Sequence, residues 1–183
     1  LRVKGAPTVS ESLQKILHGL KLPHTTLTFD LSQTENLQLN GFTQIQLLFS
    51  ANLGHQPVAV EKAASGGELS RLMLALQQMV SEKKALPTII FDEIDTGVSG
   101  EVALKMASLL QEMSKNGQCL AITHLPQVAA RGDVQWQVSK SGEGEAGAVI
   151  SRIRPLSSKE RVEEIARMLG GEQITATTRR HAR

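Results

Sequence analysis

Hydrophobic residues recur along the chain with two different periods, and together these periods predict a mixed α/β protein. Apolar residues three and four positions apart indicate a helix over 8–20, with Thr8 and Glu11 placed as a capping box at its start. Alternation of apolar and polar residues indicates two half-buried strands over 25–31 and 41–50, joined by the polar turn "SQTENLQLNG". The chain is therefore expected to open with a helix and a hairpin.

A longer helix is expected after a loop over 51–64, directly behind the sequence "SGGE". Its apolar positions recur at helical spacing and form one stripe. The residues of this stripe are Leu69, Leu72, Met73, Leu76, Met79 and Val80. A stripe that includes methionine is typical of a helix packed on a core, and we interpret it in that way rather than as a cofactor site.

Two continuous apolar runs, "TIIFDE" and "QCLAITH", lie on either side of a further amphipathic helix. Such runs are typical of parallel strands that are buried on both faces. The apolar residues of the helix between them are Val102, Met106, Leu109, Leu110 and Met113. Strand, helix and strand in this order predict a right-handed βαβ unit.

The last part of the chain predicts two more strands, over 134–140 and 148–153, around the loop "SGEGEAG". A closing helix follows, with Ser157 and Glu160 as its capping box. The residues expected to face inward on this helix are Val162, Ile165, Ala166 and Leu169. The basic tail is interpreted as a solvated helix end; its residues are Arg179, Arg180, His181 and Arg183.

Composition restricts the class of protein. Of the 183 residues, 40% are hydrophobic and 21% are charged, which is typical of a globular domain rather than a disordered chain. No apolar run reaches the roughly 20 residues that a membrane span needs, and a net charge of +2 does not by itself argue for nucleic acid. The single cysteine, Cys119, suits a reducing cytosol and is interpreted as a small buried hydrophobe rather than a catalytic thiol.

Two acids end the first apolar run. Open α/β sheets bind ligands at the carboxyl ends of their strands, and Asp92 and Glu93 are expected at that edge. An aspartate there can hold Mg²⁺ on nucleotide phosphates, and a second carboxylate can orient or deprotonate the attacking water. The two acids could equally cap the following loop, and the dipeptide alone does not decide between these readings.

The second apolar run ends in His124, which is expected at the same edge of the sheet as Glu93. A histidine at that edge could hydrogen-bond a phosphate and the attacking water, or it could be a structural residue. The other histidines lack metal-ligand spacing and receive no role; they are His18, His24, His55 and His181.

Glycines mark two further places. Ser65 and Glu68 fit a capping box, yet the two glycines between them cost roughly 1 kcal/mol each relative to alanine at a helix start. Something is therefore expected to approach the backbone there, and an anion is the natural candidate at a helix N-terminus. In "IDTGVSG", Gly97 and Gly100 allow close approach and Asp95 is placed to reach across an interface, although this composition equally suits a turn.

The order of these features is more specific than any one of them. It resembles the C-terminal half of ABC-type ATPases, with "SGGE" as the signature motif, "TIIFDE" as the Walker B strand, "IDTG" as the D-loop and "AITH" as the switch histidine. Within that superfamily, "ASGGELSRLMLAL", "IIFDEIDTGVSGEVA" and "AITHLPQVAARGD" are similar to the RecN family of bacterial DNA double-strand-break repair proteins, which are related to SMC proteins. The similarity extends from about Asn52 to Arg167, and more loosely over the two strands before it.

The resemblance implies an α/β fold of the ABC ATPase head type, with a parallel core, flanking helices and additional antiparallel strands. Residues 1–183 would form a single C-terminal lobe: a coiled-coil junction at 1–7, a helix and hairpin over 8–63, and the signature, Walker B, D-loop and switch-histidine region over 64–183. The sequence contains no Gly-Lys pair and hence no Walker A loop. In the family that loop and the Q-loop lie in an N-terminal lobe beyond a long coiled coil, and with Leu1 in place of Met we expect this chain to be a portion of a longer protein.

In the family, two heads sandwich ATP, and the signature motif of one head faces the Walker A loop of the other. The resemblance therefore implies ATP and Mg²⁺ as ligands. The residues expected to contact ATP or its interface are Ser65, Gly66, Gly67, Glu68 and Asp95. Asp92 would help to hold Mg²⁺, Glu93 would position and polarise the hydrolytic water, and His124 would sense the γ-phosphate.

The implied partners are the N-terminal Walker A lobe of the same protein, a second head in an ATP-sandwiched homodimer, and DNA, with no membrane. The implied location is cytoplasmic and nucleoid-associated, and the ATP cycle would drive the bridging of DNA ends in recombination after DNA damage. Residues 1–183 alone are expected to have little or no ATPase activity, because the phosphate-binding lysine is missing. The alternatives are the equivalent half of another SMC- or RecF-like ATPase, and an assembly module without catalysis.

Overall fold

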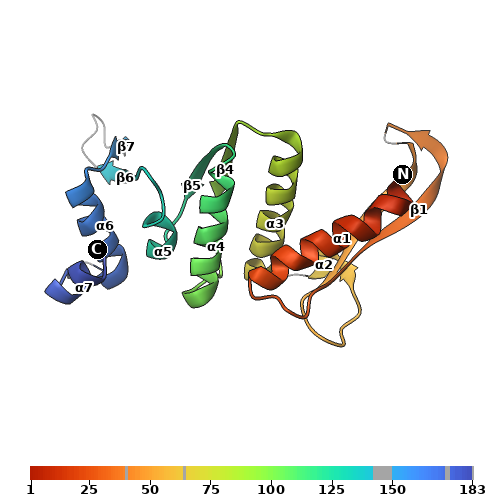
Figure 1. Ribbon diagram of the computed structural model, residues 1–183, viewed down its shortest axis with the longest axis horizontal. Coiled ribbons are helices and arrows are strands. Elements are labelled where there is room, and N and C mark those ends of the chain that lie inside the picture. Colours follow the sequence, from red (N-terminus) through yellow and green to blue (C-terminus); the bar gives the residue numbers. More distant parts are fainter. Residues whose placement is uncertain (40, 64, 142–149, 172–173, 183) are drawn as a thin grey trace. The chain divides into compact units, whose positions relative to one another are not determined.

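The computed structural model describes residues 1–39, 41–63, 65–141, 150–171 and 174–182 (Figure 1). Contacts divide the chain into two compact units, 1–122 and 123–183, and each is described here by itself. The expectation of a single lobe over 1–183 stays a prediction. Most of the expected loop "SGEGEAG" and the start of the strand after it, residues 142–149, lie outside the described residues, as does Arg183 of the basic tail.

The first helix, α1 (Arg2–Gly19), begins six residues before the expected start at Thr8 and contains Pro7 in its interior. Proline cannot donate its amide within a helix and usually marks a helix start, which is why the sequence favoured a later beginning. A tertiary contact holds the first turn instead, because Arg2 Nη1 donates to the carbonyl oxygen of Thr43 at 2.8 Å. The capping box expected at Thr8 is therefore wrong.

Strands β1 (Thr26–Gln38) and β2 (Gly41–Ser50) form the expected antiparallel hairpin, with α1 lying along it (Figure 1). β1 continues through most of the segment that the sequence assigned to a polar turn. A short strand β3 (Val58–Ala59) pairs with β2, and a short helix α2 (Val60–Ala63) follows it. The expected loop over 51–64 is thus only partly a loop, because strand pairing with β2 orders residues whose local pattern carries no strand signal.

Helix α3 (Gly66–Lys84) follows, as expected, and completes the core of the first unit. That core consists of Leu13, Leu17, Leu22, Leu27, Phe49, Leu72 and Ala75. The predicted stripe on α3 is correct at Leu72, which belongs to the core, and at Leu76 and Met79, which pack against it. It is wrong at Leu69, Met73 and Val80, which are exposed. Helix α3 contacts α1 and also α4, so its buried residues are divided between two sides of the helix rather than gathered on one face.

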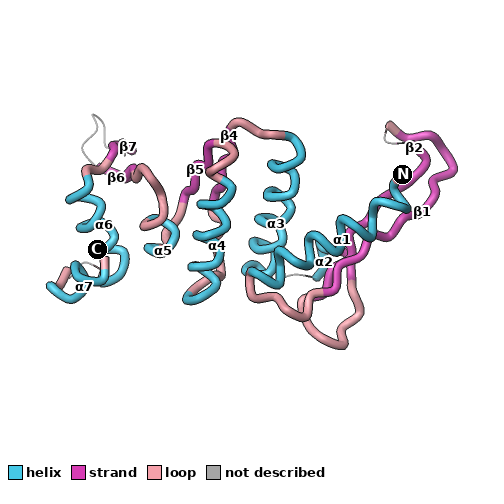
Figure 2. Tube along the Cα trace, viewed as in Figure 1, coloured by secondary structure: helices cyan, strands magenta, loops and turns pink. Residues whose placement is uncertain are grey.

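The βαβ prediction is confirmed in its parallel pairing. Strand β4 (Thr88–Asp92), helix α4 (Gly100–Met113) and strand β5 (Gln118–Ile122) succeed one another, and β4 pairs with β5 in parallel (Figure 2). Among the described residues these two strands pair only with each other.

Burial on both faces of these strands, which the sequence predicted, is wrong. On one face Phe91 is fully buried, whereas on the other Ile90 is 62% exposed and Ile122 is 56% exposed. Cys119 is half-buried, and burial raises the pKa of its thiol, which fits a packing residue rather than a nucleophile. The sheet is therefore covered on one side by this chain and open on the other.

The second unit contains a short helix α5 (Pro126–Ala129), the antiparallel strands β6 (Trp136–Ser141) and β7 (Ile150–Pro155), and the helices α6 (Ser158–Gly170) and α7 (Ala176–His181). The capping box of α6 is confirmed: the Ser157 amide donates to Glu160 Oε2 at 2.8 Å. Ile165 and Ala166 are buried as expected, but Leu169 is exposed.

Candidate nucleotide-binding site

The start of α3 contains both features that the sequence suggested for "SGGE". Ser65 is the N-cap in an extended conformation, its amide donates to Glu68 Oε2 at 3.3 Å, and its side chain faces the amide of Glu68 as in a capping box. Ser65 and Gly66 are both exposed. A helix N-terminus presents unsatisfied amides and the positive end of the helix dipole, so this exposed helix start can accept an anion.

The two glycines at this helix start serve different purposes. A Cβ built on Gly66 meets nothing within 4 Å, so the backbone at Gly66 is open to approach from outside. A Cβ on Gly67 would lie 2.7 Å from the carbonyl oxygen of Gly97, closer than real Cβ contacts allow. Gly67 is therefore required by a contact inside the chain, and Gly66 is the glycine whose surroundings leave room for a ligand.

The two acids follow β4 as expected. Asp92 is the last residue of the strand and pairs in register with Ile122 of β5, so it lies at the carboxyl end of the parallel pair. Glu93 leaves the strand with a φ of 51°, a left-handed conformation that non-glycine residues rarely adopt. Both acids are exposed. An exposed pair of carboxylates at this edge has the position that phosphate and metal chemistry require in α/β sheets.

The loop between β4 and α4 is built from two successive turns. The Thr96 amide donates to the Glu93 carbonyl at 3.3 Å, and the Val98 amide donates to the Asp95 carbonyl at 3.1 Å. Ile94 and Val98 are buried and anchor the loop, and Asp95 is only 1% exposed. In this conformation the carboxylate of Asp95 is inside the protein rather than presented at a surface.

His124 lies two residues beyond the end of β5 and belongs to the second unit. It is exposed, and the hydroxyl of the neighbouring Thr123 accepts a hydrogen bond from the Leu125 amide at 3.0 Å, directly before α5. The first unit brings the signature residues and the loop after Asp92 together. The expected placement of His124 on the same edge as Glu93 stays a prediction.

Arg71, to which the sequence gave no role, connects the signature helix to the end of α1. Its Nε donates to the Gly67 carbonyl at 2.9 Å, and its Nη1 donates to the Leu20 carbonyl at 3.2 Å. Burial lowers the pKa of Arg71, which nevertheless stays charged at neutral pH. The Leu20 and Lys21 carbonyls are at the C-terminal end of α1, where the helix dipole favours a cation. The sequence signal for this role was an arginine six residues after the signature serine. The carbonyl groups that Arg71 contacts at the end of α1 could not be predicted from the sequence.

Polar groups of the second unit form a structural network rather than a further site. The Ser157 hydroxyl and amide, followed by Arg154, hold the pKa of Glu160 down at about 2. Arg167 lowers the pKa of Glu164, which also accepts a hydrogen bond from Gln137 at 2.8 Å. This network joins β6 and β7 to α6.

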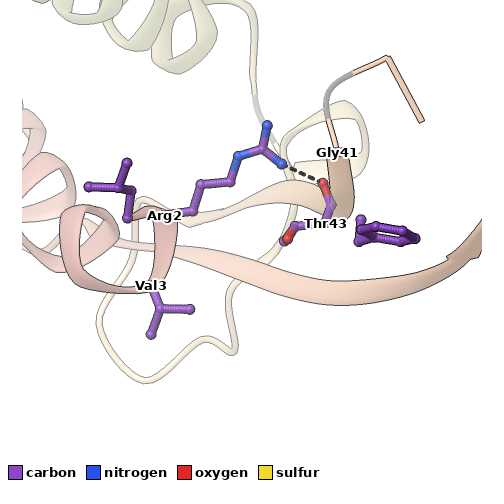
Figure 3. Close-up of a pocket in the computed structure, with 6 residues that line it drawn as sticks. Arg2, Val3, Gly41 and Thr43 are labelled. Carbon is purple, nitrogen blue, oxygen red and sulfur yellow. Dashed lines mark hydrogen bonds between the residues drawn. The ribbon is translucent and has the colours of Figure 1, made fainter. Parts of the chain in front are cut away.

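A cavity of about 370 Å³ lies elsewhere in the first unit, between the start of α1 and the tip of the hairpin (Figure 3). It is lined by Leu1, Arg2, Val3, Gly41, Phe42 and Thr43. Among the described residues that line it, Arg2 alone has a charged side chain, and one guanidinium nitrogen donates to the Thr43 carbonyl. None of the residues that carry the signature or Walker B pattern lines this cavity, so we do not assign it to the nucleotide.

Metal coordination by this part of the protein alone is not supported. Among the described residues, no three histidine, cysteine, aspartate or glutamate side chains gather as a metal site. Magnesium usually keeps several waters and is bound by one or two carboxylates together with substrate phosphates. A single exposed aspartate at the end of β4 fits that kind of site.

Comparison with solved structures identifies the class of fold. A chain from a structural study of "ATP-driven dimerization and DNA stimulated activation of SMC ATPases" matches with a TM-score of 0.59 and 25% identity, over 90% of this chain and 92% of that one. An SMC head domain with a coiled coil and joint from Pyrococcus yayanosii matches with a TM-score of 0.65 and 24% identity, over 86% of this chain and 28% of that one. The chain thus has the fold of an SMC-type ATPase head, in its C-terminal lobe.

Sequence relatives identify the family. The chain is 44% identical over 151 residues to the DNA repair protein RecN of Bacillus subtilis, covering 82% of this chain and 26% of that protein. It is 38% identical over 187 residues to RecN of Halalkalibacterium halodurans, covering 100% of this chain and 33% of that protein. No protein-family model matches the chain. The chain belongs to the RecN family, and it spans about a third of the length of the curated relatives it matches.

Proposed function

We propose that the chain is the C-terminal half of an ATP-hydrolysing head whose ATP is sandwiched between two heads, and that ATP-driven dimerisation of the heads serves DNA repair. The observation that supports this most directly is the open approach to the Gly66 backbone at the N-terminus of α3, where the next residue, Gly67, packs against Gly97 of the loop that follows the exposed Asp92 and Glu93. The family relationship supports the role, since RecN relatives are DNA repair proteins, and the likeness to an SMC ATPase chain supports ATP hydrolysis.

On this proposal Ser65 donates its hydroxyl, and Gly66 and Gly67 direct their amides, to the γ-phosphate of ATP held by the partner head. Bound ATP would supply the phosphoanhydride bond that is hydrolysed, and the helix N-terminus would stabilise the negative charge of the γ-phosphate. Glu68 keeps the helix start ordered through the capping box that the free head already contains. Ser65 would thereby cap the helix in one state and bind phosphate in the other.

The two acids after β4 have separate roles on this proposal. Asp92 would hold Mg²⁺, directly or through a water, and Glu93 would orient the attacking water as a general base. His124 would sense the γ-phosphate once the head is assembled. Because Asp95 is buried in this structure, its link between the two sites requires the 93–99 loop to rearrange when the heads meet.

An N-terminal lobe of the same protein is the partner that the first unit requires. Side chains alternate between the faces of a strand, so Ile90, Leu120 and Ile122 share one face of the β4–β5 pair with Asp92. All three apolar residues are exposed, whereas parallel strands in α/β proteins are normally covered on both faces. Since the chain spans about a third of its relatives, the remainder of the protein is the natural cover for this face.

The second unit has a similar exposed surface. Trp136, Val138 and Ile153 share one face of the β6–β7 hairpin and are 64%, 63% and 61% exposed. The opposite face presents Gln137 and Arg154, which contact Glu164 and Glu160 of α6. The helix therefore covers the polar face and leaves the apolar face for another part of the protein, which we again take to be the N-terminal lobe.

In the complete protein, the ATP cycle would open and close the heads, and a coiled coil would convert that motion into the bridging of DNA ends. The protein would act at the nucleoid in the cytoplasm, in recombination after DNA damage. No described helix is long and apolar enough to cross a membrane.

Steady-state ATP hydrolysis by the full-length protein tests the proposal. We expect turnover that requires Mg²⁺ and falls at least about 100-fold in Glu93→Gln, because the base that orients the water is removed. Glu112→Gln is the matched control and should keep full activity, because Glu112 is an exposed acid on α4 whose carboxylate pairs with Lys115. Absence of hydrolysis in the wild-type protein would instead support the alternative of an assembly module without catalysis.

Residues 1–183 alone should hydrolyse little or no ATP, since the sequence contains no Gly-Lys pair to form a Walker A loop. Adding the N-terminal lobe as a separate chain should restore turnover. Robust hydrolysis by residues 1–183, lost in Glu93→Gln, would contradict the proposed division of the site between lobes.

A further inference from the structure

The loop that follows Asp92 holds Glu93 in an unfavourable backbone conformation. At a φ of 51°, Glu93 is in the left-handed region, which costs a non-glycine residue about 1–2 kcal/mol. Thr96 compensates with two hydrogen bonds to the same atom. Its hydroxyl donates to the Glu93 carbonyl oxygen at 2.9 Å, and its amide donates to that oxygen at 3.3 Å.

The same turn is packed against the signature helix. Gly97, the residue after Thr96, packs against Gly67, because a Cβ added to Gly67 would come within 2.7 Å of the Gly97 carbonyl oxygen. On α3, the Ser70 hydroxyl donates to the Gly66 carbonyl at 2.9 Å and lies 3.5 Å from the Thr96 carbonyl oxygen, at the limit of a hydrogen bond. Thr96 is thus located between the start of α3 and Glu93.

Buried residues limit how this loop can respond to a displacement of α3. Ile94 and Val98 are inserted into the protein on either side of Thr96, and Asp95 is buried with them. Thr96 and Gly97 are exposed and face the helix start instead. A displacement of Gly67 is therefore transmitted first to Gly97 and Thr96, and through the two hydrogen bonds of Thr96 to Glu93.

We propose that Thr96 is a positioning residue, whose hydroxyl fixes the backbone of Glu93 and couples the placement of its carboxylate to the position of the signature helix within the same head. This inference rests on the proposed function. In that case Ser65–Gly67 of one head would bind the γ-phosphate of the partner's nucleotide. The same binding event would change the position of Glu93 in the head that contributes Ser65–Gly67. Thr96 would act through Glu93, whose carbonyl oxygen accepts both of its hydrogen bonds.

The test uses the full-length protein with Thr96→Val, which keeps the shape of the side chain and removes the hydroxyl, and Thr96→Ser, which keeps the hydroxyl. We expect Thr96→Val to lower kcat about tenfold with KM and nucleotide Kd within about twofold of wild type, because misplaced catalytic groups reduce turnover without removing binding contacts. Thr96→Ser should restore kcat to within about twofold. If Thr96→Val is not folded by thermal melting, Thr96→Ala replaces it.

A measurement without nucleotide separates this role from general damage. Hydrogen–deuterium exchange of residues 93–99 should be several-fold faster in Thr96→Val and unchanged in Thr96→Ser, with exchange in β1 and β2 the same in all three proteins. In a Glu93→Gln background, adding Thr96→Val should lower the residual rate no further, because Thr96 acts through Glu93.

The outcomes distinguish this inference from the proposed function. If the wild-type protein hydrolyses ATP and Glu93→Gln abolishes turnover while Thr96→Val retains kcat, the role of Thr96 is wrong and the proposed function stands. The role of Thr96 is also wrong if Thr96→Ser lowers kcat as much as Thr96→Val does. It is wrong as well if adding Thr96→Val to Glu93→Gln lowers the residual rate further. If the wild-type protein has no ATPase activity, the proposed function fails first.

Discussion

The backbones of Gly67 and Gly97 lie against each other so closely that a Cβ on Gly67 would come within 2.7 Å of the Gly97 carbonyl oxygen. Gly97 itself has a φ of +71°, which only glycine adopts without strain. The start of α3 and the loop after Asp92 and Glu93 are therefore joined within one chain. This contact explains one of the two glycines that "SGGE" places at a costly position.

The first prediction concerns the stability of this contact. Gly67→Ala should lower the free energy of unfolding of residues 1–183 by about 1–3 kcal/mol, because the added methyl group requires one of the two backbones to shift. Gly66→Ala is the matched control and should leave that free energy unchanged or raise it by up to about 1 kcal/mol, since alanine favours the helix and meets no neighbour. Urea unfolding followed by circular dichroism measures both. Equal effects of the two substitutions would show that the contact with Gly97 is not tight.

The second prediction concerns the interface between heads. In the full-length protein, Ser65→Arg should abolish ATP-dependent dimerisation of the heads, because a large side chain at the helix start blocks the partner's γ-phosphate, while monomer nucleotide binding stays within about twofold. Analytical ultracentrifugation with and without ATP measures the dimer. Ser157→Arg removes an equivalent helix cap in the second unit and should leave dimerisation intact. Loss of nucleotide binding by the Ser65→Arg monomer would contradict the assignment of Ser65 to the interface between heads.

The third prediction concerns Arg71, which ties the signature helix to the end of α1. Arg71→Met keeps most of the side-chain volume and removes hydrogen bonds to the Gly67 and Leu20 carbonyls, so it should lower the free energy of unfolding by about 1.5–3 kcal/mol. Lys21→Met removes an ion pair with Glu101 whose side chains are 48% and 63% exposed, and should cost less than about 1 kcal/mol. Chemical denaturation of residues 1–183 compares the two. A larger loss of unfolding free energy in Lys21→Met than in Arg71→Met would show that the Lys21–Glu101 ion pair stabilises the protein more than the hydrogen bonds of Arg71 do.

The fourth prediction concerns pH. The pKa of Glu160 is lowered to about 2 from an ordinary value of 4.5, chiefly by the Ser157 hydroxyl. A carboxyl whose pKa is lower in the folded state contributes stability above its unfolded pKa and loses it as the pH falls toward the folded pKa. The wild-type protein should therefore lose more stability between pH 5 and pH 2 than Glu160→Gln does, as followed by thermal melting across that range. An identical pH dependence in both proteins would mean that Glu160 titrates normally.

Local patterns in the sequence anticipated those features whose causes are local. The capping boxes at Ser65 and Ser157 depend on residues three positions apart, and the structure contains both. Strand β2 has the bounds that alternation predicts, and the two continuous apolar runs became the parallel strands β4 and β5. The order of motifs was sufficient to indicate the family, because sequence order is what defines those motifs.

Other features depended on contacts between distant segments, and the sequence misplaced them. Helix α1 begins before Pro7 because Arg2 is held by the Thr43 carbonyl, 41 residues away. Residues of β3 become a strand only because β2 provides an edge to pair with. The burial expected for Ile90 and Ile122 failed because the described residues leave this face of the sheet uncovered, and a hydrophobic run does not say which segment would cover it.

The sequence by itself determined the fold class and the likeness to RecN proteins, because both are encoded in residue order and short-range spacing. Its assignment of candidate signature, Walker B and switch residues stays a prediction. Only the tertiary structure decided that Gly67 is required by Gly97 while Gly66 stays open, that Asp95 is buried, and that Arg71 and Thr96 bind the signature helix to its surroundings. Those relationships join segments 26 to 51 residues apart, and hydrogen bonds to carbonyl oxygens leave no trace in the identity of the accepting residue.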